Sequence, residues 1–130
     1  MPIYAGFHPH FKAQSELVKL KTNATELYDY NDHFVKDFAG EIDMESLKEA
    51  VVLLDVSYPS LFMQLDQTRK IVMNTDSSFS YTMLWTESGK DFVCLEPWMA
   101  KTGEMDRKEE LKMIGPRDVL EARVEFGVIV

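Results

Sequence analysis

The last twelve residues, "VLEARVEFGVIV" (119–130), carry the clearest structural signal in the chain. Apolar side chains alternate there with charged or small ones. The apolar positions are Leu120, Ala122, Val124, Phe126 and Val128. A period of two places successive side chains on opposite faces of the backbone, which is typical of a half-buried β-strand. The segment therefore predicts a strand with one face on a core.

Further segments towards the N-terminus resemble this one. They alternate or are rich in aromatic and β-branched residues, and we interpret them as strands: 15–23, 60–67, 68–75, 79–86 and 91–98. Segments 60–67 and 68–75 predict a hairpin that turns near Asp66 and Gln67. Strands at this short spacing predict an all-β fold, an antiparallel β-sandwich, in a single domain over residues 1–130.

Two segments depart from the strand pattern. "MESLKEAVVLLD" (44–55) has apolar residues at helical spacing, which predicts a short helix over about 46–50 before the β-branched pair Val51-Val52 returns to strand. Residues 101–118 are polar and contain Gly and Pro, so we expect a long loop there.

Charge and composition exclude several classes of function. The net charge of −8 disfavours binding to nucleic acid or to an anionic membrane surface. No apolar run approaches the roughly 20 residues of a membrane span, and the N-terminus lacks the features of a secretory signal. With Cys94 alone no intramolecular disulfide can form, so we expect a cytoplasmic protein.

The sequence also predicts no metal site and no cofactor. The three histidines and the one cysteine do not form a cluster with the spacing of metal ligands. We expect Cys94 to be a small buried side chain, because no electropositive neighbours in the sequence would activate its thiol.

Two ionisable residues share a local feature that suits a rigid site. His8 precedes Pro9 and Glu96 precedes Pro97, and a following proline restricts each of them to extended backbone conformations. Glu96 ends an apolar run, and burial there would raise its pKa towards that of a useful general base. Alternatively, Glu96 is a solvated surface acid and His8 is an inert loop histidine. Asp55, a third candidate, could likewise be a turn or cap residue.

Four motifs, in this order, resemble the C-terminal half of the aldose 1-epimerase (galactose mutarotase) family. They are "GFHPHF" (6–11), "LLDVSY" (53–58), "FSYTMLWT" (79–86) and "FVCLEPW" (92–98). The resemblance continues through residues 102–126, which are similar to the family's loop and final strand. It implies a galactose mutarotase-like antiparallel β-sandwich, of which this chain is a part.

The resemblance also implies an activity, the interconversion of the α and β anomers of an aldose such as glucose or galactose through the open-chain sugar. Glu96 would be the base that deprotonates the C1 hydroxyl, and His8 would be the acid that protonates the ring oxygen. Asp55 would bind sugar hydroxyls, and Trp98 would form a wall of the sugar site. We expect Glu96 and His8 to flank the anomeric centre in a common cleft.

Other functions stay open at this stage. The family's first half supplies an arginine and a further histidine to the site, and His10 is not assigned to that role. The chain could therefore be a carbohydrate-binding or vestigial domain without turnover, or a structural half-domain that completes a partner. Uncovered strand edges suggest a homodimer as a hypothesis. A sugar phosphate is a weaker candidate substrate because the sequence shows no basic cluster.

Overall fold

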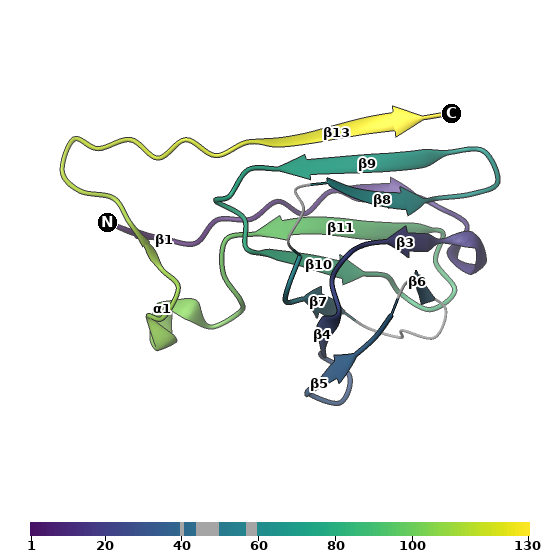
Figure 1. Ribbon diagram of the computed structural model, residues 1–130, viewed down its shortest axis with the longest axis horizontal. Coiled ribbons are helices and arrows are strands. Elements are labelled where there is room, and N and C mark those ends of the chain that lie inside the picture. Colours follow the sequence, from purple (N-terminus) through teal and green to yellow (C-terminus); the bar gives the residue numbers. More distant parts are fainter. Residues whose placement is uncertain (40, 44–49, 57–59) are drawn as a thin grey trace.

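Two antiparallel sheets form the body of the computed structural model, which describes residues 1–39, 41–43, 50–56 and 60–130 (Figure 1). The six-stranded sheet has the spatial order β2 (His10–Lys12), β11 (Phe92–Trp98), β10 (Tyr81–Trp85), β7 (Val51–Leu53), β4 (Glu26–Asp29), β5 (Phe34–Asp37). The five-stranded sheet has the order β13 (Val124–Ile129), β9 (Lys70–Thr75), β8 (Ser60–Gln64), β3 (Lys19–Lys21), β6 (Glu41–Asp43). The predicted all-β, antiparallel fold is confirmed.

Four short elements complete the described chain. Strands β1 (Pro2–Ile3) and β12 (Lys112–Met113) pair with each other, and α1 (Glu104–Arg107) lies between β11 and β12. A 3₁₀ turn, η1 (Ser15–Leu17), precedes β3. In Figure 1 the N-terminus and α1 lie at the opposite end of the molecule from the C-terminus, and β13 runs along one edge. No helix among the described residues is long and apolar enough to cross a membrane.

The core lies between the two large sheets. In the strands that cover it, such as β8 to β11, alternate residues point into it, as the period of two requires. Leu84 and Leu95 are fully buried in this core, while their chain neighbours Met83 and Glu96 lie on the outer face of the six-stranded sheet. The facing sheet contributes the alternate residues of β8 and β9: Leu61, Met63, Ile71 and Met73. The outer face of the six-stranded sheet is therefore available for a site.

The predicted hairpin is confirmed. Strands β8 and β9 pair from Ser60–Asn74 to Gln64–Lys70, and the turn follows at Asp66. The Asp66 carboxylate accepts hydrogen bonds from the amides of Thr68 and Arg69, which hold its pKa well below the usual range. The turn is thus fixed by one acidic side chain that satisfies two backbone donors.

Other predictions are correct only in part. The C-terminal strand begins at Val124 instead of 119, because its partner β9 ends at Thr75, the residue opposite Val124. The predicted loop over 101–118 contains α1 and β12, and the predicted strand over 15–23 begins with a 3₁₀ turn. Most of the predicted helix over 46–50 lies outside the described residues, whereas the return to strand at Val51 is confirmed as β7.

Candidate functional site

A short N-terminal segment lies beside the end of β11 and forms one side of a pocket. The β2–β11 pairing holds one end of this segment, and an isolated bridge between Gly6 and Trp98 holds the other. His8 lies between these two anchor points. Because Pro9 favours an extended conformation at the residue before it, His8 continues the direction of β2 and comes to lie against Glu96.

Gly6 is required for this close approach. A Cβ atom added at Gly6 would lie 2.7 Å from Cδ1 of Trp98 and 3.2 Å from the carbonyl oxygen of Pro97. Both distances are shorter than ordinary van der Waals contact, so any other residue would push the segment away from β11. The sequence motif "GFH" therefore places a glycine where the backbone has to approach an indole ring.

Glu96 is the buried acid of the pocket. Its side chain is 2% exposed, and one carboxylate oxygen, Oε2, accepts a hydrogen bond from the indole Nε1 of Trp98 (3.0 Å). Burial raises the pKa of Glu96, and the charge of His8 and the Trp98 N–H partly offset that rise. Trp98 thus fixes the orientation of the carboxylate and leaves Oε1 for other contacts.

His8 contacts that second oxygen. Its Nδ1 atom lies 3.3 Å from Oε1 of Glu96, while 54% of its side chain remains exposed. The structure therefore brings the two predicted catalytic residues together, but in contact and without the expected gap between them. A hydrogen-bond donor and a carboxylate attract each other, and the exposed imidazole is free to rotate towards or away from the buried acid.

The pair opens into a pocket of about 330 Å³. This volume lies at the lower end of the range for small-ligand sites, about 300 to 1,000 Å³. Nine residues from the N-terminal segment, β11 and the chain after it line the pocket: Tyr4, Ala5, Gly6, Phe7, His8, Glu96, Trp98, Ala100 and Thr102. Three of the four predicted site residues, Glu96, His8 and Trp98, are among them. The pocket thus combines an acid and an imidazole with apolar and aromatic walls.

Asp55, the fourth predicted site residue, does not line this pocket. Its carboxylate accepts hydrogen bonds from the amide of Thr25 (2.8 Å), from the Thr25 hydroxyl (2.6 Å) and from the amide of Glu26 (3.0 Å). The Thr25 hydroxyl is the main reason why the pKa of Asp55 lies below its ordinary value. These bonds join the end of β7 to the start of β4, so a structural role is evident and the role in sugar binding stays a prediction.

The wall next to His8 contains residues that the sequence did not single out together. The imidazoles of His8 and His10 stack with centroids 4.8 Å apart, and the Trp85 ring lies nearly perpendicular to both. Cys94 lies directly opposite His10 on one side and Trp85 on the other, and it is fully buried as predicted. Burial, together with the charge of Glu96, raises the pKa of its thiol to about 12.

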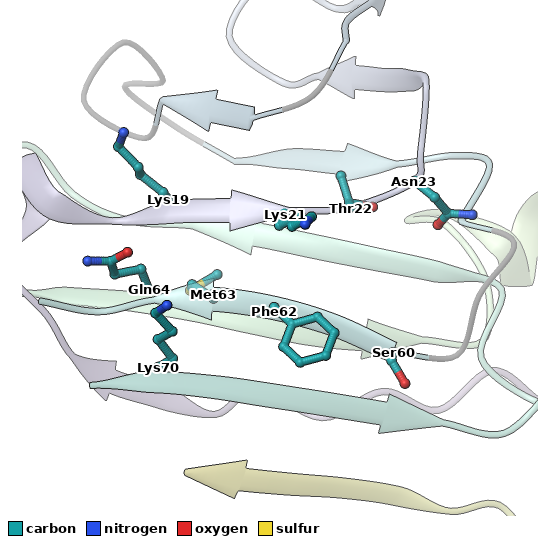
Figure 2. A pocket seen from close by; sticks show the side chains of 9 residues that line it. All are labelled: Lys19, Lys21, Thr22, Asn23, Ser60, Phe62, Met63, Gln64 and Lys70. Carbon is teal, nitrogen blue, oxygen red and sulfur yellow. The ribbon is translucent and has the colours of Figure 1, made fainter. Parts of the chain in front are cut away.

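A second, larger pocket of about 500 Å³ lies on the outer face of the five-stranded sheet (Figure 2). Lys19, Lys21 and Lys70 line it together with Phe62, and these three lysines form a basic cluster that the sequence did not reveal. On the neighbouring strand β6, Asp43 lies opposite Lys19 and Glu41 lies opposite Lys21 in the strand pairing. This pocket and the pocket at Glu96 lie on opposite faces of the sandwich, so one small ligand cannot contact both.

Comparison with known proteins supports the fold. No family model and no curated protein matches the chain. Among solved structures, the Slr1438 protein from Synechocystis sp. PCC 6803 superposes with a TM-score of 0.89 at 27% identity, over 99% of this chain and 45% of that one. A putative mutarotase (YeaD) from Salmonella typhimurium gives a TM-score of 0.77 at 14% identity, over 99% and 46%.

A putative aldose 1-epimerase from Escherichia coli K12 also matches, with a TM-score of 0.64 at 15% identity, over 99% of this chain and 50% of that one. The chain therefore spans about half the length of the solved structures it resembles. Together these similarities assign it a galactose mutarotase-like antiparallel β fold.

Proposed function

We propose that this chain catalyses the interconversion of the α and β anomers of an aldose, with Glu96 as general base and His8 as general acid. One observation carries the proposal: a buried carboxylate and a half-exposed imidazole meet at the edge of a small pocket with aromatic walls. The fold is that of structures described as a putative mutarotase and a putative aldose 1-epimerase.

Ring opening needs two proton transfers on one sugar. Glu96 takes the proton from the C1 hydroxyl through Oε1, and the His8 imidazolium gives its proton to the ring oxygen as the bond from that oxygen to C1 breaks. The product is the open-chain aldehyde. Rotation about the bond between C1 and C2, followed by the reverse transfers, closes the ring as the other anomer and returns both residues to their starting states.

The mechanism requires Glu96 to start as a carboxylate and His8 to start as an imidazolium. Their contact suits this requirement, because two opposite charges at that distance would stabilise each other. The imidazole then has to rotate away from Oε1 so that the anomeric centre can enter between the two groups. Its 54% exposure leaves room for this rotation. Trp98 holds Oε2 throughout and presents its ring as the wall of the sugar site.

Polarimetry of freshly dissolved α-glucose or α-galactose tests the proposal. The protein should accelerate mutarotation above a heat-denatured control, and both Glu96→Gln and His8→Asn should remove the acceleration. His33→Asn is the matched control, because His33 lies in the turn between β4 and β5, and asparagine tolerates its positive φ of 63°. Sugar binding without acceleration would instead indicate a carbohydrate-binding domain.

A further inference from the structure

Three side chains that can ligate metal ions meet on the β2 side of the pocket. His8, His10 and Cys94 each offer one ligand atom, and these three atoms lie within 4.8 Å of one another. No local pattern in the sequence indicates this group, because Cys94 is far along the chain from both histidines. The β2–β11 pairing creates the group by setting His10 directly opposite Cys94.

Hydrogen bonds already orient both imidazoles. Nδ1 of His10 lies 3.2 Å from the carbonyl oxygen of His8, and a carbonyl oxygen can only accept, so this Nδ1 carries the proton. Nδ1 of His8 faces the Glu96 carboxylate in the same way. In a neutral imidazole this arrangement leaves the lone pair on Nε2. Metal-ligating histidines in proteins typically have such an outer carbonyl or carboxylate acceptor.

We propose that His8, His10 and Cys94 form a binding site for Zn²⁺ or a similar divalent ion. Two imidazole nitrogens and one thiolate are a ligand set that zinc accepts, with a fourth position left for water or another ligand. The thiol releases its proton to solvent as the sulfur–metal bond forms. The Glu96 carboxylate then acts as the outer acceptor for the His8 ring.

The observed spacing requires a small closure. Zinc bonds of about 2.0 to 2.3 Å place ligand atoms roughly 3.5 Å apart, so the three atoms have to approach by about 1 Å. Both histidines are exposed, and rotation of their side chains supplies this movement while β2 and β11 stay paired.

Metal binding would also affect any acid–base role of His8, since a metal-bound nitrogen cannot carry a proton. The site itself does not depend on that role: it follows from ligand type and position alone. Binding can therefore be measured without any sugar.

The experiment uses Co²⁺ as a spectroscopic probe and Zn²⁺ as competitor, on the reduced full chain. Co²⁺ should produce a thiolate-to-metal charge-transfer absorption and should quench tryptophan fluorescence, because Trp85 touches both histidines. Zn²⁺ should displace it. His10→Asn and Cys94→Ala should each weaken binding by at least about 10-fold, the lower limit for losing even an outer partner of a ligand. His33→Asn should leave binding unchanged.

Two results would overturn the proposal. One is Co²⁺ binding without the charge-transfer absorption, which would show that Cys94 is not a ligand. The other is an equal affinity in the wild-type chain and in His10→Asn. Because His10 is exposed, that variant should fold normally, so it remains informative even if Cys94→Ala destabilises the core.

Discussion

Replacing Glu96 by glutamine should reduce activity and increase stability at the same time. Glutamine keeps the shape of the side chain and an oxygen that can accept the Trp98 N–H, but it cannot take a proton from a sugar hydroxyl. General acid–base catalysis by one group contributes about 10²- to 10⁴-fold, so the barrier should rise by about 3 to 5 kcal/mol. Polarimetry of α-glucose gives this ratio directly.

The gain in stability follows from the burial of the carboxylate. The folded-state pKa of Glu96 lies above its ordinary value of 4.5, so the folded chain binds this proton more tightly than the unfolded chain does. Glu96 therefore lowers stability progressively as the pH rises from about 4.5 to its folded pKa, and the penalty is complete above that. The loss of the contact with His8 should not turn this gain in stability into a loss. His8 is half exposed, so its imidazole stays hydrated when the Glu96 carboxylate is removed.

Urea unfolding at several pH values measures the effect. The Glu96→Gln variant should be more stable than the wild type at pH 8, and the difference should shrink below pH 4.5. Glu87→Gln is the matched control, because Glu87 is exposed in the loop after β10. A variant that is less stable than the wild type at pH 8, or one that keeps full activity, would refute the reasoning.

Four further predictions concern the pocket, its supports and the sheet edges. Gly6→Ala should displace the Trp98 ring, since the new Cβ would lie 2.7 Å from it, and should abolish sugar acceleration in polarimetry while the urea midpoint falls only slightly. Glu104→Gln should lower the free energy of unfolding in urea by about 2 kcal/mol, because it removes the fully buried carboxylate that pairs with Arg107 at 2.7 Å; an unchanged midpoint would contradict this. Asp55→Ala should lower the free energy of unfolding by about 1 kcal/mol at pH 7, and the effect should shrink as the pH falls below 3.8 through the lowered folded pKa of Asp55, because the contribution disappears as the carboxylate is protonated. Light scattering should detect a homodimer at high concentration, because β13 pairs with β9 on one side and, within the described chain, with no strand on the other; a monomer at every concentration would remove that hypothesis.

The strands with strong local signals were predictable. β11 and the β8–β9 hairpin stand out by their apolar runs, because each packs one face on the shared core. β13 stands out by its alternation, but the predicted burial of its apolar face is wrong: only Val124 packs against the core, and Phe126 and Val128 are exposed. The β4–β5 hairpin was missed. Its second strand is exposed at all four residues, Phe34–Asp37, so it carries no alternation that burial would impose.

The candidate site was predictable only as separate residues. Glu96 and His8 could be proposed from the motifs that contain them, but their contact depends on the pairing of β2 with β11, which lie far apart in the sequence. The same pairing places His10 beside Cys94 and Trp85, and no local sequence pattern predicts this arrangement. Local sequence thus indicated the elements, whereas the geometry of the pocket depends on long-range pairing.

A double-variant comparison tests most directly whether Glu96 and His8 act as one unit on the sugar. Mutarotation rates should be measured for Glu96→Gln, His8→Asn and the double variant, with stability checked for each. If the two groups transfer protons in the same step, the double variant should be no slower than the slower single variant. Rate losses that multiply, or a His8→Asn variant as fast as the wild type, would contradict a shared role.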